Sequence, residues 1–252
     1  MTLFNYKFFK KKFIDDIFFN RDNFLNFFYN GHDDLIIFDI GANKGQSIDY
    51  FKKLFKNSAI HSFEPETTNF KLLEDKYKKN KNIIINNIAF GSTEESRILN
   101  CYSDSAQNSF FKIEKESEAI QYNAHPKVTN CIKQTVNSEL VNIQTLDNYI
   151  LKNNIEKINI VKIDVQGFEN EVLLGSNSSL NKNIIDLLII EISFDGVYGI
   201  SNSFSNVENI LAPNNYILWD ISHIYKDLSR GRTCWVDAVY VHKDFITIKQ
   251  SI

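Results

Sequence analysis

Four short segments of this sequence combine glycines and acids in a way that suits ligand binding and proton transfer. They are the turn at residues 41–45, the acid Glu64, the segment 164–167 and the acid Glu191. Glycines let a backbone approach a bound molecule closely, whereas carboxylates accept hydrogen bonds and protons. Each segment directly follows or ends an apolar run, so we expect all four to lie at the ends of buried strands.

The elements that must position these segments follow from hydrophobic periodicity. Short apolar runs typical of buried strands occur at residues 35–40, 59–63, 83–90, 158–165 and 184–192. Helical spacing predicts helices near residues 48–55, 67–77, 146–151 and 203–211. We take Thr67 or Thr68 as the N-cap of the second helix. Residues 216–221 and 235–242 predict a final, antiparallel pair of strands.

The alternation of strands and helices predicts an open α/β sheet with right-handed crossovers. In such a sheet, ligands bind at the carboxyl ends of the strands, where the four segments lie. Residues 92–144 do not follow the alternation of strands and helices and are interpreted as an insertion. Residues 1–34 are predicted to form a helical extension, and residues 35–252 a single catalytic domain.

The composition narrows the class of protein. The chain has 252 residues, 43% of them hydrophobic, and a formal net charge of −3, which predicts a folded domain and disfavours a nucleic-acid partner. No apolar run reaches membrane-spanning length, and the N-terminus lacks the pattern of a signal peptide. Three widely spaced cysteines suit a reducing compartment, so we expect a cytoplasmic protein. The phenylalanine-rich extension is a candidate homodimer interface.

The first turn and Glu64 together favour an adenosine cofactor, because an acid at the end of the second strand can accept hydrogen bonds from ribose hydroxyls. A dinucleotide would need the pattern G-x-G-x-x-G, but Asn43 and Gln46 stand at its second and third glycine positions. The P-loop pattern is also absent. S-Adenosyl-L-methionine carries no phosphate and is compatible with this turn.

Six segments taken in order closely resemble the FkbM family of S-adenosylmethionine-dependent methyltransferases. They read FDIGANKGQS, HSFEPE, NIAFG, IQTLDNYI, VKIDVQGFENEVLLG and IIEIS, and the resemblance runs from about residue 35 to about residue 193. It implies a class I, Rossmann-like fold with a seven-stranded, mostly parallel sheet and helices on both faces. It also implies methylation of a hydroxyl on a sugar or a related scaffold. Many family members carry Glu where this chain has Gln166.

The resemblance assigns cofactor contacts residue by residue, for S-adenosyl-L-methionine and its product S-adenosyl-L-homocysteine. The first strand and turn contribute Asp39, Gly41, Ala42, Asn43 and Gly45. Glu64 is expected to hold the ribose, and Asn87 and Ala89 to contact the adenine.

Four residues are candidates for preparing the acceptor hydroxyl: Asp164, Glu169, Glu191 and His223. A general base helps because a protonated sugar hydroxyl is a poor nucleophile. Each has a structural alternative, such as a turn cap for Asp164 or a first-turn helix acid for Glu169. Asp164 and Glu191 end neighbouring strands and could share a divalent cation, but two carboxylates are too few to assign a metal site.

The acceptor is expected to meet polar residues of the overhanging segments. These are Asn108 and Ser109 in the insertion, Gln166 after the fourth strand, and Tyr198 in a late loop. The predicted function is O-methylation of a sugar, either nucleotide-activated or a precursor of a surface glycan. Alternatives are methylation of a non-sugar small molecule and a non-catalytic subunit on the same fold. A nicotinamide dehydrogenase lacks its glycine pattern here, and an amine-directed nucleic-acid methyltransferase lacks its [DN]PP[YF] motif.

Overall fold

The computed structural model describes residues 23–113, 135–194, 203–227 and 231–250. The chain divides into two units, residues 1–32 and 33–252. Within the described residues, the first unit contributes helix α2 (Asn23–Tyr29). The phenylalanine-spaced helix expected before it lies outside the described residues. The homodimer therefore stays a prediction, which light scattering of the full-length and truncated protein tests.

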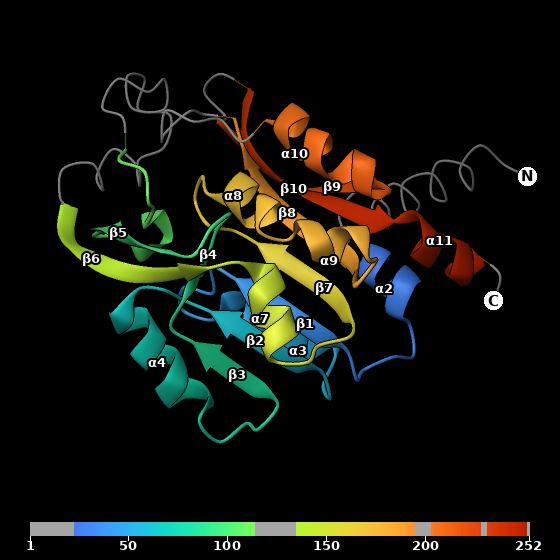
Figure 1. Cartoon of the computed structure of the whole chain (residues 1–252), viewed down its shortest axis with the longest axis horizontal. Helices are drawn as coiled ribbons and strands as arrows, with labels where there is room; N and C mark the ends of the chain where they lie inside the picture. Colours follow the sequence, from blue (N-terminus) through green and yellow to red (C-terminus); the bar gives the residue numbers. More distant parts are fainter. Residues whose placement is uncertain (1–22, 114–134, 195–202, 228–230, 251–252) are drawn as a thin grey trace, which may run out of the picture. The chain divides into compact units, whose positions relative to one another are not determined.

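The larger unit is built on a seven-stranded sheet in the order β3-β2-β1-β7-β8-β10-β9 (Figure 1). The strands are β1 (Ile36–Ile40), β2 (Ala59–Phe63), β3 (Ile83–Asn86), β7 (Ile158–Ile163), β8 (Ile185–Ser193), β9 (Tyr216–Asp227) and β10 (Arg232–His242). Strands β3, β2, β1, β7 and β8 pair in parallel, and β10 pairs antiparallel with both β8 and β9. This strand order confirms the predicted class I methyltransferase fold.

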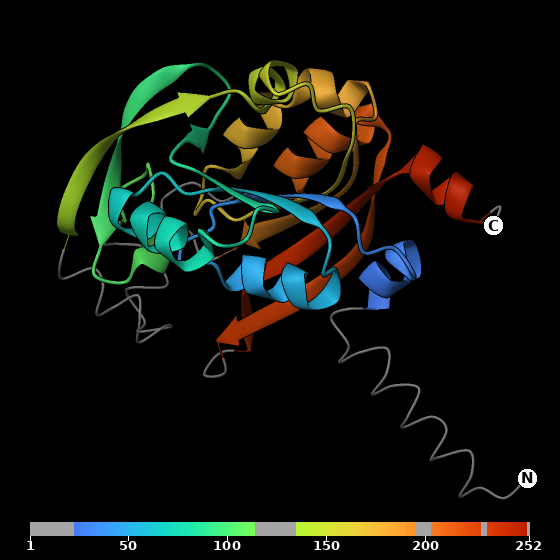
Figure 2. The same cartoon turned by 90° about the horizontal axis from the view of Figure 1, so that it is seen from below.

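Helices cover both faces of this sheet (Figure 2). On one face lie α3 (Gln46–Leu54) and α4 (Thr67–Tyr77), and on the other lie α7 (Leu146–Lys152), α8 (Glu169–Leu174), α9 (Asn177–Asn181) and α10 (Phe204–Leu211). The short helix η2 (Ala212–Asn214) follows α10, and α11 (Lys243–Gln250) follows β10. Helices α9 and α11 were not expected, whereas α8 begins at Glu169, in agreement with the alternative interpretation of Glu169 as a first-turn helix acid.

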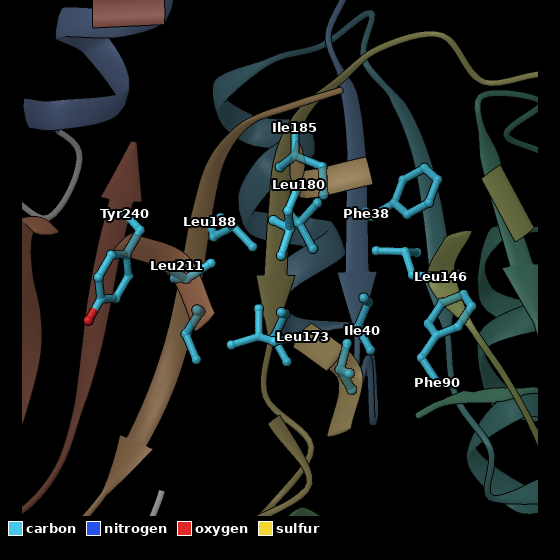
Figure 3. Close-up of a cluster of buried hydrophobic side chains, with 14 of the residues drawn as sticks. Phe38, Ile40, Phe90, Leu146, Leu173, Leu180, Ile185, Leu188, Leu211 and Tyr240 are labelled. Carbon is cyan, nitrogen blue, oxygen red and sulfur yellow. The ribbon is translucent and has the colours of Figure 1, made fainter. Parts of the chain in front are cut away.

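The main core fills the space between the sheet and helices α7 to α10. Phe38 and Ile40 of β1 point into it together with Leu173 and Leu180 (Figure 3). Because successive side chains of a strand point to opposite faces, Asp39 lies on the other side of β1. The strands therefore carry an apolar set on one face and place several charged residues on the other.

The sequence pattern was wrong about the run 83–90, which does not form one strand. The chain leaves the main sheet after β3, and Ala89–Phe90 forms β4 of a second sheet with the order β4-β6-β5. The other strands of this sheet are β5 (Glu95–Tyr102) and β6 (Thr135–Gln144), both within the predicted insertion. Side-chain amides explain the break, since Asn86 donates to the Ser62 carbonyl and Asn87 to those of Glu64 and Pro65.

The N-cap of α4 also differs from the predicted threonines. The Glu66 side chain accepts hydrogen bonds from the amides of Thr68 at 3.0 Å and Asn69 at 2.7 Å. A carboxylate that reaches back over the first turn satisfies two amides that the helix leaves unpaired. The N-cap of α4 is therefore Glu66 and neither of the two threonines.

We expect Glu66→Ala to lower the free energy of unfolding by about 1 kcal/mol, the usual effect of losing an N-cap. Thermal denaturation measures this change. The control is Glu74→Ala, the same substitution at an exposed position of the same helix. Equal destabilisation by the two variants would contradict the capping role of Glu66.

Candidate active site

The parallel strands β1, β2, β7 and β8 end at one edge of the sheet, where a cavity of about 250 Å³ opens. Nine residues singled out from the sequence line this cavity: Gly41, Asn43, Glu64, Ala89, Asn108, Asp164, Gln166, Glu169 and Glu191. Six others are described but lie outside its wall: Asp39, Ala42, Gly45, Asn87, Ser109 and His223. Tyr198 falls outside the described residues.

The turn after β1 is pressed against the segment that follows β7. Gly41 has a φ of +87°, and a Cβ atom at this position would lie 1.9 Å from the backbone oxygen of Asp164. The amides of Gly41 and Ala42 donate to the Phe63 carbonyl at 3.0 and 3.1 Å. Asn43, with a φ of +47°, continues this left-handed course. The turn therefore needs glycine both for its backbone angle and for its close approach.

Glu64 is buried and faces the same turn. Its Oε2 accepts from the Asn43 amide at 2.7 Å, and its Oε1 accepts from the Glu66 amide at 2.9 Å. Burial raises the pKa of Glu64 to about 8, although both amides favour the charged form. A carboxylate oriented in this way can still accept hydrogen bonds from a diol through its remaining lone pairs.

The insertion closes over the glycine turn through the short helix η1 (Ser105–Gln107). The Ser105 hydroxyl donates to Asn43 Oδ1 at 2.7 Å, and the side-chain amide of Asn69 donates to the same atom at 3.1 Å. Asn108 lines the cavity just after η1, and its Oδ1 accepts from the Tyr102 amide. Asn43 thus joins the turn, α4 and the insertion.

One end of the cavity is apolar. Its wall there includes Ile88, Ala89, Phe90, Leu99 and Phe110. A flat heteroaromatic base fits such a surface, because most ligand sites pair apolar walls with a few placed polar groups. Asn87, which was predicted to contact the base directly, instead holds backbone carbonyls of the neighbouring loop.

Asp39 is a fully buried carboxylate behind the turn. Within the described part of the chain neither oxygen has a hydrogen bond of good geometry, although the Ser47 side chain is close enough to favour the charged form and lower the pKa. Burial raises its pKa to about 6, while the Lys162 ammonium opposes the shift. Lys162 is its register partner on β7 and lies on the same face of the sheet. An unsatisfied buried carboxylate is costly, and such a group beside a cavity is typical of a ligand site.

Four side chains form a connected cluster at the ends of β7 and β8. Lys162 forms an ion pair with Asp164 Oδ2 at 2.8 Å. The Gln166 side-chain amide donates to Asp164 Oδ1 and to Glu191 Oε1, both at 2.9 Å. One amide therefore bridges two carboxylates that face the cavity.

The backbone holds Gln166 in an unfavourable conformation. Its φ is +52°, a left-handed value that costs energy for a residue with a side chain. The Ser109 hydroxyl donates to its carbonyl at 2.6 Å, and Glu169 accepts from the amides of Val165 and Gly167. Glu169 and Ser109 thus stabilise the turn that carries Gln166, and burial raises the pKa of Glu169 to about 7.

The pKa values of the two bridged carboxylates are shifted in opposite directions. Burial favours the neutral form of Asp164, but the Lys162 ammonium and the Gln166 amide outweigh it and lower the pKa of Asp164. The pKa of Glu191 is raised well above its usual value by burial and then by the charges of Asp164 and Glu169. Once ionised, Glu191 is therefore the stronger base of the two carboxylates.

His223 lies on β9, away from the cavity wall. Its Nδ1 is 2.9 Å from Asp237 Oδ2, and its side chain is 40% exposed. Asp237 is the register partner of Glu191, so it connects His223 indirectly to the site. The positive φ of His223, +45°, marks an irregularity in β9.

Two important residues were not singled out from the sequence. Lys162 is a buried charge within the largely apolar run INIVKI, and that contrast between a lysine and its apolar neighbours is itself a signal in the sequence. Trp235 also lines the cavity, but it belongs to a strand far along the chain, and no local pattern identified it.

The cavity fits S-adenosyl-L-methionine by several observations. A glycine turn that a Cβ would obstruct, a buried acid in the cavity wall, a buried carboxylate without a hydrogen bond of good geometry and a set of apolar wall residues occur together. Among the described residues, no three His, Cys, Asp or Glu side chains converge to hold a metal ion. None of the helices in the described ranges is long and apolar enough to cross a membrane.

Comparisons with known proteins identify the family of this chain. Residues 39–218 match the family model described as the methyltransferase FkbM domain. No curated protein matches the sequence.

Solved structures with a similar fold are distant in sequence. A precorrin-6y C5,15-methyltransferase from Geobacter metallireducens is 11% identical, with a TM-score of 0.44 over 88% of this chain and 87% of that chain. A SAM-dependent methyltransferase from Aquifex aeolicus is 11% identical, with a TM-score of 0.45 over 90% and 92% of the two chains. Fibrillarin from Aeropyrum pernix with bound S-adenosyl-L-methionine is 11% identical, with a TM-score of 0.45 over 83% and 67%. By its family match, the chain belongs to the methyltransferase FkbM domain family, which uses S-adenosyl-L-methionine.

Proposed function

We propose that this protein transfers a methyl group to a sugar hydroxyl, acting in the cytoplasm on a nucleotide-activated sugar or a glycan precursor. The observation that carries the proposal is the bridge of Asp164, Gln166 and Glu191 at the cavity. Two planar carboxylates and an amide in one cluster can hydrogen-bond several hydroxyls at once. An acceptor hydroxyl beside them can lose its proton as it reacts.

When bound, S-adenosyl-L-methionine supplies the methyl group: a C–O bond forms to the acceptor, the C–S bond breaks, and its electron pair stays on the sulfur of S-adenosyl-L-homocysteine. Glu191 takes the hydroxyl proton in our proposal. Asp164, fixed by Lys162, orients the hydroxyl through the same cluster. Gln166 bridges the two carboxylates through its side-chain amide. Much of the rate comes from alignment of the reacting atoms.

Two measurements test this function. Calorimetry should detect saturable binding of S-adenosyl-L-homocysteine, with NAD as the negative comparison. Label from methyl-tritiated S-adenosyl-L-methionine should then appear in a pyranoside, with NMR locating the new methoxy group. Binding of the homocysteine product together with labelling of only non-sugar hydroxyls would replace the sugar by another small molecule. Binding without transfer to any hydroxyl would favour a non-catalytic subunit.

The affinity for S-adenosyl-L-homocysteine is expected to rise with pH up to about pH 8. The free protein holds Glu64 protonated below its raised pKa of about 8, and ribose hydroxyls donate best to the ionised form. Binding therefore releases a proton at lower pH, with a slope of at most about tenfold per pH unit. Calorimetry in buffers of different ionisation enthalpy measures the release. Glu64→Gln, the isosteric control, should bind more weakly and lose this pH dependence; an unchanged slope would exclude Glu64.

A further inference from the structure

The cavity wall also contains an aromatic side chain, Trp235, which lies on β10, the strand that pairs with the strand of Glu191. Register pairs Trp235 with Ser193, and Asp237 with Glu191, across β10 and β8. Opposed residues and residues two apart share one face of a sheet, so Trp235 lies on the same face as Glu191. Ser193 and Trp235 both line the cavity.

Trp235 is held in a stacked pair. Its ring centroid lies 3.8 Å from that of Tyr225 on β9, with the two rings 7° from parallel. Tyr225 is also its register partner. A large aromatic ring packed in this way keeps one orientation and presents a rigid apolar surface.

The backbone around this pair is irregular on both sides. The pairing of β10 with β9 shifts between Thr233 and Trp235 and again between Trp235 and Asp237. Such bulges re-aim side chains and are common beside active sites. The Asp237–His223 contact lies at the second shift, where His223 has its positive φ. We interpret His223 as a residue that stabilises the irregular strand, since its side chain does not line the cavity.

The charge of the wall limits what can lie against Trp235. As far as the structure describes it, the wall contains the acids Glu64, Asp164, Glu169 and Glu191 and no lysine, arginine or histidine. The nearby Lys162 is already paired with Asp164. Asp164 holds its charge beside Lys162, and Glu191 must be ionised to act as the base. An anionic group next to the reacting hydroxyl would then meet Glu191 without a free compensating cation in the wall, and like charges at close range repel strongly in a partly buried site.

A pyranose matches the two surfaces together. One face of its ring carries C–H groups that can pack on an aromatic ring, while its hydroxyls project at the edge toward hydrogen-bonding groups. On this wall, the aromatic face is Trp235, and the polar groups are Gln166 and Glu191.

We propose that Trp235, fixed by Tyr225, is the stacking wall of the acceptor subsite, and that this subsite selects a neutral or amino pyranose over a uronic acid. This inference rests on the proposed function and adds to it the residue that binds the acceptor and the charge class of that acceptor. Any diphosphate on the acceptor is expected to lie away from the carboxylates.

Tryptophan fluorescence tests binding directly, because the chain contains two tryptophans, Trp219 and Trp235. Trp219→Phe leaves Trp235 as the single reporter. With saturating S-adenosyl-L-homocysteine, methyl glucoside, methyl mannoside, methyl galactoside and glucosamine are the neutral and cationic probes, and glucuronate is the anionic one. A saturable change with at least one of the first four, and none with glucuronate, is expected. Saturation by glucuronate alone, or by none of the probes, would overturn the proposal.

Kinetics provide the second readout. Trp235→Leu should raise KM for the methylated glycoside about tenfold, the factor expected from losing a stacking contact, with a smaller change in kcat. The affinity for S-adenosyl-L-homocysteine should not change. Trp219→Leu is the matched control and should leave KM unchanged. An unaltered KM in Trp235→Leu with active sugar methylation would defeat this inference alone, whereas methylation of only non-sugar acceptors would defeat the proposed function itself.

Discussion

Replacing Glu191 with glutamine is expected to lower kcat by about 10²–10⁴-fold, the usual contribution of a general base. Glutamine keeps the shape of the side chain and can still bond to Gln166, so the affinity for S-adenosyl-L-homocysteine should stay the same. Steady-state kinetics and calorimetry on the same preparation measure both quantities. A loss of cofactor affinity along with kcat would indicate a structural effect.

The pH dependence of kcat is a second test of Glu191 as the base, because it predicts the direction in which kcat changes with pH. The pKa of Glu191 is raised by burial and by the charges of Asp164, Glu169 and Asp237, while Lys162 opposes the shift. A base must be ionised to act, so kcat should rise as the pH passes through this elevated pKa. Asp237→Asn removes one of the negative charges and should move the rise to lower pH.

The variant Asp164→Asn distinguishes the role of Asp164 from that of Glu191. It should also lose most of the turnover, because the ion pair with Lys162 orients the cluster. The rise of any residual activity with pH should remain, since Glu191 is intact. If Glu191→Gln retained nearly full kcat while Asp164→Asn lost it, the base would be Asp164.

Gly41→Ala is expected to abolish measurable binding of S-adenosyl-L-homocysteine. A Cβ atom would lie 1.9 Å from the Asp164 carbonyl oxygen, which is backbone and cannot rotate away. The turn after β1 and the segment after β7 must then separate, and both line the cavity. Forcing them apart should also lower the free energy of unfolding by about 1–3 kcal/mol from overpacking, in addition to the cost of the positive φ.

Gly231→Ala is the matched control for this substitution. Gly231 has a φ of +65°, but nothing lies within 4 Å of its hypothetical Cβ. It therefore carries the strain of an alanine in the left-handed region without the clash. Calorimetry and thermal denaturation of both variants separate the two effects. Equal destabilisation, or normal cofactor binding by Gly41→Ala, would contradict the close approach as the reason for glycine.

Much of the fold was predictable because its parallel strands are mostly buried, nearly continuous apolar runs. Strands β1, β2, β7 and β8 were predicted within about two residues of their bounds. Glu64 directly follows β2 and Asp164 directly follows β7, as expected, whereas Glu191 lies within β8. The run 83–90 was misjudged because side-chain hydrogen bonds of Asn86 and Asn87, and not hydrophobicity, decide where that strand ends.

The sequence alone determined the class of this protein: motif order and strand alternation indicate an FkbM-type methyltransferase, because these are properties of neighbouring residues along the chain. Only the tertiary structure decided how the site is organised. It brings Glu191 beside Gln166, places Trp235 in the wall of the same cavity, and turns Glu169 toward backbone amides. These relations depend on strand register and on side chains that meet across the sheet, and local patterns carry no information about such distances.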